Sequence, residues 1–151
     1  MRILFDTNIL LRTAQPTHPQ HHEVLDATHE LIQRGYESCI VPQCQYEFWV
    51  VATRPQNQNG LEFTAVQTEA ELARLRASLV FLNDPPDLFA EWKQLVTSLA
   101  VMGKNAHDAR FAAAMMLHGI HHLLTYNVRD FQRYPGIVPL SPSSVLSQLP
   151  P

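Results

Sequence analysis

The chain contains 151 residues, of which 46% are hydrophobic and 17% are charged. This composition is typical of a globular protein with a core of its own, so we expect one domain over residues 1–151. A net charge of −3 argues against a broad electrostatic surface for nucleic acid but allows a small local site. No apolar stretch reaches the ~20 residues of a membrane span, and no signal-peptide pattern is present, which predicts a cytoplasmic protein without a membrane segment.

The first half of the chain alternates predicted strands and helices. An apolar run from Ile3 to Phe5 leads directly to Asp6, which indicates a buried first strand with a carboxylate at its end. The predicted elements that follow are a polar loop over residues 12–22, a helix that ends at Gly35, a strand over residues 36–41 and a helix from Pro42 to about residue 54. Cys39 and Cys44 lie at the junction of the last two and are expected to be reduced, packed thiols.

The second half repeats this alternation. Leu72, Leu75 and Leu79 mark one face of a helix, and Thr68 with Glu71 has the spacing of its capping box. The remaining predicted elements are a helix opened by Asp84 and Pro85 and ended by Gly103, an alanine-rich helix over residues 106–117 capped by Asn105, and strands over residues 122–125 and 137–138. Residues 139–151 are rich in proline and serine and are expected to form a loosely ordered tail.

Strands that alternate with helices indicate an α/β protein, here with three layers (α/β/α) and a mainly parallel central sheet. In such a sheet, ligands bind outside the carboxyl ends of the strands, where the strand order reverses. Asp6, at the end of the first strand, is therefore well placed for chemistry. The alternative is that Asp6 and Asn8 only cap a helix or close a turn.

Acidic residues from distant parts of the sequence are predicted to meet at this edge. Glu47 lies early in the helix after the second strand, and Asp108 lies in the first turn of the helix that precedes the strand over residues 122–125. Asn127 and Asp130 follow that strand. If the sheet is parallel, these four residues should lie at the same edge of the sheet as Asp6.

A divalent cation would explain this gathering of acids. Glu47 is the only charge in an apolar and aromatic stretch, where a carboxylate is costly unless it is paired or bound to a metal. The alternatives are an ion pair with Arg12, Arg54 or another arginine, or an exposed position. Taken alone, Asp108 could be explained without any function, because an acid in the first turn of a helix interacts favourably with the helix dipole. Mg²⁺ or Mn²⁺ prefers oxygen ligands and can activate water for attack on phosphorus, so the residues indicate metal-dependent phosphoester chemistry.

Four short motifs support a more specific interpretation. They are residues 4–10 (LFDTNIL), Glu47, Asp108 with Ala109, and residues 124–131 (LTYNVRDF). In order and approximate spacing they resemble the PIN-domain family over nearly the whole chain, and within it the VapC-type ribonuclease toxins of bacterial toxin–antitoxin modules.

The resemblance implies an endoribonuclease site that uses Mg²⁺ or Mn²⁺. By position, Asp6, Glu47 and Asp108 correspond to the family's metal-binding acids, and the fourth acidic position falls on Asn127, so that either Asn127 or Asp130 completes the catalytic set. The residues expected to support the site are Thr7, Asn8 and Thr125.

The resemblance also implies partners. RNA would be the substrate, with backbone contacts expected from Arg12, Arg54, Arg110 and Arg129. A cognate antitoxin and a second copy of the chain, in a homodimer, are the expected protein partners. Exposed apolar helix faces within residues 72–79 and 89–99 would suit either contact, although most of these residues are expected to pack internally.

The sequence leaves three alternative functions to consider. A phosphatase could use Asp6 as the nucleophile that forms a phosphoaspartate, although Asn8 stands where such a scheme commonly has a second acid. A receiver-type signalling module usually begins with paired acids, which this chain lacks. A PIN fold that has lost catalysis and only binds a partner is the third alternative, because Asn127 replaces an acid.

Overall fold

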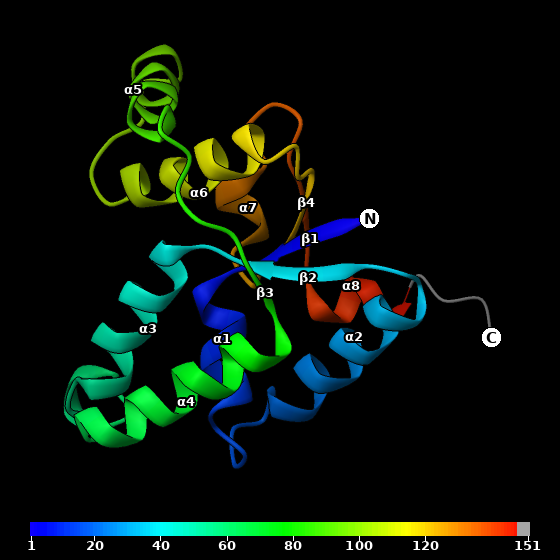
Figure 1. The fold of residues 1–151 in the computed structure, drawn as a ribbon, viewed down its shortest axis with the longest axis vertical. Coiled ribbons are helices and arrows are strands. Elements are labelled where there is room, and N and C mark those ends of the chain that lie inside the picture. Colours follow the sequence, from blue (N-terminus) through cyan, green and yellow to red (C-terminus); the bar gives the residue numbers. More distant parts are fainter. Residues whose placement is uncertain (148–151) are drawn as a thin grey trace.

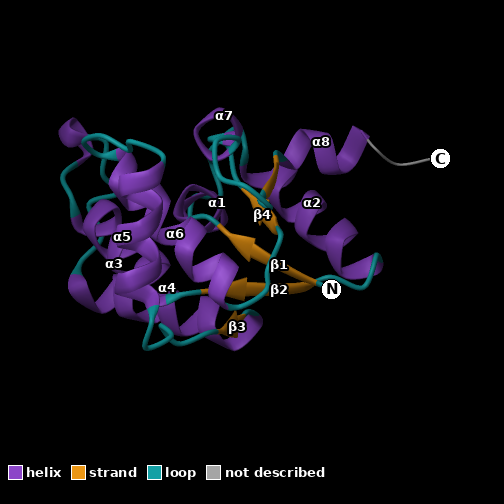
Figure 2. Ribbon diagram, turned by 90° about the horizontal axis from the view of Figure 1, so that it is seen from above, coloured by secondary structure: helices purple, strands orange, loops and turns teal. Residues whose placement is uncertain are grey.

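The computed structural model describes residues 1–147. Its centre is a sheet of five parallel strands in the order β3-β2-β1-β4-β5. The strands are β1 (Arg2–Phe5), β2 (Glu37–Ile40), β3 (Val80–Phe81), β4 (His122–Leu124) and β5 (Val138–Leu140). Figure 2 shows the strands side by side with helices around them. The expected parallel sheet is confirmed.

Helices cover both faces of the sheet (Figure 1). One layer contains α1 (Thr7–Thr13), α2 (His21–Gln33), α3 (Pro42–Thr53), α4 (Ala65–Ser78) and α8 (Pro142–Ser147). The other contains α5 (Leu88–Ser98), α6 (Asn105–Leu117) and α7 (Val128–Phe131). A short 3-10 helix, η1 (Gln56–Gln58), lies between α3 and α4. The fold is therefore the three-layer α/β/α architecture that the sequence predicts.

The strand order reverses at β1, which pairs with β2 on one side and with β4 on the other. The connections from β1 to β2 and from β2 to β3 use one helical layer, and the chain then returns through the other layer to β4. Residues that follow β1 and β4 thus lie next to each other, as the 3.0 Å hydrogen bond from the Asp6 backbone N–H to the Leu124 carbonyl shows. This is the position where open parallel sheets bind ligands.

The core explains the apolar runs of the sequence. Ile3, Leu4 and Phe5 are buried because β1 is the central strand and helices cover both of its faces. Ala112, Ala113 and Ala114 of α6 are fully buried, so this alanine-rich stretch belongs to the core. A rigid, well-packed strand therefore ends at Asp6.

Several predicted helix boundaries need correction. The helix α1 begins directly after Asp6, where the sequence predicted no helix, and it includes the first two residues of the predicted loop over residues 12–22. The capping box of α4 is formed by Thr64 and Gln67, and Thr68 instead donates to the Thr64 carbonyl from within the helix. The helix α5 begins at Leu88 with Asp87 at the N-cap position, and Asp84 pairs with Arg110 and does not cap the helix.

Other boundaries differ by less. The helix α5 ends at Ser98, before the predicted stop at Gly103, and Asn105 is the first residue of α6 rather than its cap. The two-residue strand β3 was not predicted, because it is too short to carry a periodic pattern.

The predicted loose tail is also wrong over most of its length. Pro139 and Leu140 belong to β5, which completes the sheet beside β4, and residues 142–147 form α8. Val145 of α8 is 2% exposed and α8 packs on α2, so the segment contributes to the core. Residues 148–151 of the predicted tail lie outside the described residues. Among residues 1–147, no helix is long and apolar enough to cross a membrane.

Candidate active site

Asp6 occupies the centre of the site. It follows β1 and precedes the first turn of α1, where its side chain makes no capping hydrogen bond to the helix backbone. Its Oδ2 accepts hydrogen bonds from the Thr125 hydroxyl at 2.6 Å and from the Asn8 side-chain amide at 2.8 Å. Asp6 is only 5% exposed. Asp6 thus occupies the N-cap position of α1 through its backbone, while its carboxylate is used by Thr125 and Asn8 and does more than cap the helix.

Thr125 and Asn8 form a network that fixes this carboxylate. The Thr125 oxygen accepts from the backbone N–H of Asn127 at 2.9 Å and from the Asn8 amide at 3.3 Å. The Asn8 side-chain carbonyl in turn accepts from the backbone N–H of Tyr126 at 3.2 Å. Two of the residues predicted to support the site thus connect Asp6 to the loop that leaves β4.

Glu47 reaches the same region from α3, and each oxygen of its carboxylate accepts a hydrogen bond. Thr7 donates its hydroxyl to Oε2 at 2.8 Å, and the Gln43 amide donates to Oε1 at 2.8 Å. Within residues 1–147, no arginine or lysine forms an ion pair with Glu47. The alternative of a salt bridge with Arg12 or Arg54 is thus excluded.

Asp108 lies in the first turn of α6, on the other side of the site. Burial and the nearby Asp130 and Glu47 carboxylates raise its pKa to about 6. Asn127 precedes α7 and is exposed, and its side chain lines the same cleft as Asp108. Asp130 is exposed and does not line that cleft, although its charge acts on Asp108. The geometry therefore favours Asn127 over Asp130 as the fourth residue at the site.

A cleft of about 610 Å³ connects these groups. Apolar and aromatic side chains form part of its wall, among them Leu11, Tyr46, Val50 and Val51. The predicted site residues that line the cleft are Asp6, Thr7, Asn8, Glu47, Asp108, Arg110 and Asn127. Residues from positions 6 to 127 thus converge at one edge of the sheet, as the sequence predicted.

Within residues 1–147, the acids of the cleft form no ion pair with lysine or arginine. Burial raises the pKa of Asp6 to about 6, and the charges of Glu47 and Asp108 add to this increase, while the Thr125 hydrogen bond opposes it. Within the described part of the chain, the ion pairs of lysine or arginine involve only Glu37, Glu30, Glu71 and Asp84. Neither Asp6 nor Asp108 is among these acids. A bound cation would relieve this repulsion.

The oxygen ligands available at the cleft suit a hard cation. Carboxylate oxygens of Asp6, Glu47 and Asp108 and the amide oxygen of Asn127 are the ligand types that Mg²⁺ and Mn²⁺ prefer. Over residues 1–147, no three acidic, histidine or cysteine side chains lie close enough together to hold an ion by themselves. Mg²⁺ usually retains several waters and takes only one or two carboxylates directly, so the residues fit this ion without a closed cage.

The four predicted RNA-binding arginines occupy different surroundings. Arg12 donates to the Gln15 and Gln20 side chains, and Arg54 donates to the Asn59 carbonyl at the far end of α3. Neither lines the cleft. Arg110 does line it but is held by Gln43 and Asp84. Arg129 is exposed on α7, two residues after Asn127. The structure therefore does not bring the four arginines together.

Gln43 is a residue of the site that the sequence motifs did not indicate. It is 4% exposed, lines the cleft and contacts Glu47, His107 and Arg110. Gln43 precedes Glu47 by four residues, which places both on one face of a helix. This spacing is the sequence signal that could have indicated Gln43 as a site residue.

The fold and the site together define a three-layer α/β/α domain with an acidic cleft at the carboxyl edge of a parallel sheet, where the strand order reverses. The chain belongs to the PIN domain family, whose model matches residues 3–137. The expected family is thus confirmed. Comparison with curated proteins gives no significant match.

Solved structures share this fold at low sequence identity. VapBC-1 from nontypeable Haemophilus influenzae has a TM-score of 0.71 at 15% identity, covering 95% of this chain and 99% of that one. DNA-bound VapBC from Salmonella typhimurium has a TM-score of 0.68 at 18% identity, with coverage of 94% and 98%. VapC20 of Mycobacterium tuberculosis, described as a toxin that cleaves the sarcin-ricin loop, has a TM-score of 0.58 at 18% identity, with coverage of 80% and 86%. At these identities the likeness concerns the fold.

Proposed function

We propose that this protein is a metal-dependent endoribonuclease and the toxin of a toxin–antitoxin pair. The observation that carries the proposal is the convergence of Asp6, Glu47, Asp108 and Asn127 on one cleft without a basic partner for the first three. Membership of the PIN domain family and the fold shared with a toxin that cleaves the sarcin-ricin loop support RNA as the substrate.

In the proposed mechanism, the carboxylates of Asp6, Glu47 and Asp108 would hold Mg²⁺ or Mn²⁺ together with waters, with one or two of them bound to the ion directly. When bound, the ion would lower the pKa of a water and stabilise negative charge on the phosphoryl group. Thr125 and Asn8 fix the Asp6 carboxylate by their contacts with Oδ2, and Thr7 and Gln43 fix both oxygens of Glu47. Such prior orientation limits the reorganisation that the site needs when the substrate binds. Asn127 supplies a neutral amide at the mouth of the cleft.

The proposal extends to partners. Tyr46 and Val50 lie on α3 beside the cleft and are 64% and 58% exposed. We propose that a cognate antitoxin covers this apolar rim, as the VapBC complexes of similar fold suggest. Of the two predicted apolar faces, Leu72 and Leu75 are buried, whereas Phe89 is 69% exposed and remains available for contact. We also propose that the chain forms a homodimer, and the molar mass of the isolated protein from light scattering tests this.

Cleavage of a panel of structured RNAs, with Mg²⁺ or Mn²⁺ and with EDTA, tests the nuclease. Asp6→Asn and Asp108→Asn are expected to lower the rate at least a hundredfold, while Asp26→Asn, at an exposed acid of α2, serves as the matched control and leaves it unchanged. Equal rates in all four proteins would identify a contaminating nuclease. No cleavage by the wild type would favour a fold that only binds a partner, and labelling of Asp6 by acetyl phosphate would favour the phosphoaspartate alternative.

A further inference from the structure

We propose that Gln43 is a positioning residue for Glu47, and that Asp84 and Arg110 act on the active site through it. The inference rests on the proposed function, because it assigns Glu47 a defined orientation in the cleft. It also gives Arg110 a role different from the RNA contact that the sequence predicted.

The side-chain amide of Gln43 has a partner for each of its polar groups. Its Nε2 donates to Glu47 Oε1 at 2.8 Å and to the His107 carbonyl at 2.9 Å, and its Oε1 accepts from Arg110 Nη1 at 3.1 Å. Rotation of the amide by half a turn would place NH₂ against the guanidinium and oxygen against the carboxylate. The contacts therefore permit one orientation, in which the amide directs a donor at Glu47.

Gln43 also joins the two walls of the cleft. It shares α3 with Glu47, whereas His107 directly precedes Asp108 on α6. Because Gln43 is 4% exposed, water cannot readily replace its hydrogen bonds. A single amide thus holds the Glu47 side chain and, through the His107 carbonyl, the α6 backbone next to Asp108.

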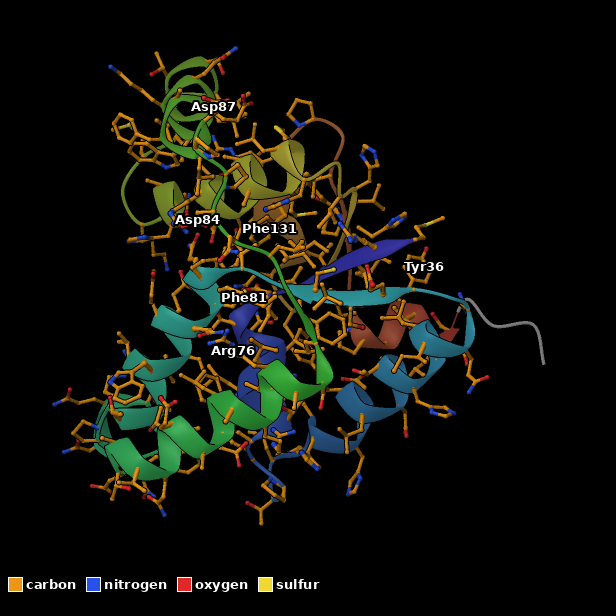
Figure 3. The ribbon with its side chains drawn as sticks, in the orientation of Figure 1. Tyr36, Arg76, Phe81, Asp84, Asp87 and Phe131 are labelled. Carbon is orange, nitrogen blue, oxygen red and sulfur yellow. The ribbon has the colours of Figure 1, made fainter. Side chains whose placement is uncertain are left out.

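Arg110 receives its own orientation from Asp84. Its Nη2 donates to Asp84 Oδ2 at 2.6 Å, while Nη1 faces Gln43. Figure 3 shows Asp84 on the segment that joins β3 to α5, beside α6. A planar guanidinium can satisfy two partners at fixed directions, which a lysine ammonium does less well. The series Asp84, Arg110, Gln43 and Glu47 therefore links the β3–α5 connection to the acidic cleft.

Gln43→Leu tests the role of the amide. Groups that orient a metal ligand typically change metal affinity or activity by ~10–100-fold. Isothermal titration of the RNA-free protein with Mn²⁺ is expected to show a loss of that size, and RNA cleavage is expected to slow in parallel. Gln45→Leu is the matched control on the same helix, because Nε2 of Gln45 is buried without a hydrogen-bond partner. Equal Mn²⁺ affinity for Gln43→Leu and Gln45→Leu would overturn the proposal.

A double-mutant cycle tests whether Arg110 acts through Gln43. Arg110→Met is expected to weaken Mn²⁺ binding several-fold in the wild type, and Arg110→Lys is expected to rescue little of this loss. Neither is expected to have a further effect in the Gln43→Leu background. Additive losses would mean that Arg110 acts independently of Gln43, and full rescue by Arg110→Lys would mean that only its charge matters. Either result contradicts the proposal.

A measurement without metal or RNA separates this proposal from the nuclease assignment. In metal-free protein, the side-chain NH₂ protons of Gln43 should give two distinct, slowly exchanging NMR signals. We expect Arg110→Met and Glu47→Gln to shift these signals, and Gln45→Leu to leave them in place. Signals that are unaffected by the first two variants would overturn the proposal whatever the protein does to RNA. A wild type with the expected signals but no cleavage would contradict the proposed function alone.

Discussion

The Thr125 hydroxyl donates a 2.6 Å hydrogen bond to Oδ2 of Asp6, and the two residues are 119 positions apart in the chain. Thr125 is completely buried, and its oxygen also accepts the backbone N–H of Asn127. This contact joins the ends of β1 and β4 at the point where the strand order reverses. The orientation of the central carboxylate is therefore set by the sheet and by the loop that follows it.

Thr125→Val keeps the shape of the side chain but removes this hydrogen bond. The backbone N–H of Asn127 loses its acceptor and Asp6 loses a donor, which should lower the free energy of unfolding by ~1–3 kcal/mol. The pKa of Asp6 should also rise further, since the Thr125 contact opposes the effect of burial. Urea denaturation at pH 7 measures the first effect. Thr125→Ser retains the hydroxyl and should lose less than half as much, and an equal loss in both variants would contradict this account.

The raised pKa of Asp6 predicts how stability depends on pH in metal-free protein. Burial raises it from 3.8 to about 6, so between these values the folded state binds more protons than the unfolded state. Stability should therefore fall as pH rises through this window, by about 3 kcal/mol for Asp6 once it is ionised. Asp108 acts in the same direction. Thermal melts in EDTA between pH 4 and pH 8 measure the effect.

Asp6→Asn is the control that isolates this carboxylate. The lowered pKa values of His18 and His122 have the opposite effect on stability. The folded state binds fewer protons at these histidines than the unfolded state does, so their contribution to stability increases as pH rises. These histidines contribute equally to wild type and variant, so the stability difference between the two proteins reports on Asp6. The variant should become the more stable protein as pH rises from 4 to 7. Added Mg²⁺ should stabilise the wild type more than the variant, and a difference that is independent of pH would contradict the assignment.

The positions of the acids at the sheet edge could be predicted because strand ends carry strong sequence signals. The apolar run before Asp6 and the alternation of strands and helices determine which edge Asp6, Glu47 and Asp108 share. The hydrogen-bonded neighbours of these acids could not all be predicted in this way. Gln43 contacts Glu47 within one helix, but its contacts with His107 and Arg110 span 64 and 67 positions and depend on how α3 packs near α6.

Helix starts and short elements were predicted less well for physical reasons. Both Thr64 with Gln67 and Thr68 with Glu71 have the spacing of a capping box, so spacing alone does not distinguish them, and the structure forms the first pair. Asp84 has the chemistry of a helix cap, but its carboxylate pairs with Arg110 from a different part of the chain. The strands β3 and β5 are short and are stabilised by pairing with neighbours, so their own sequences contain little periodicity.

The two cysteines should be inert in the folded protein. Both are buried, burial raises the pKa of the Cys39 thiol to about 11, and it raises the pKa of the Cys44 thiol further. Since the thiolate is the reactive form, a disulfide reagent at pH 8 should label neither residue within minutes and should label both in guanidinium chloride. Fast labelling of one thiol without denaturant would show that the core opens locally, at β2 for Cys39 or at α3 for Cys44.

Gly60 should tolerate substitution poorly, because its α-carbon lies against the end of α3. A β-carbon at this position would lie 1.8 Å from the Arg54 carbonyl oxygen, which accepts the Glu62 backbone N–H at 3.0 Å. Gly60→Ala must move that carbonyl and disturb the hydrogen bond, which should lower the free energy of unfolding by at least ~3 kcal/mol. Gly35→Ala is the control: Gly35 has a φ of +79° with no atom within 4 Å of an added β-carbon, so only backbone strain of ~1–2 kcal/mol is expected. Equal losses in urea denaturation would show that the loop between α3 and α4 can rearrange around the extra methyl group.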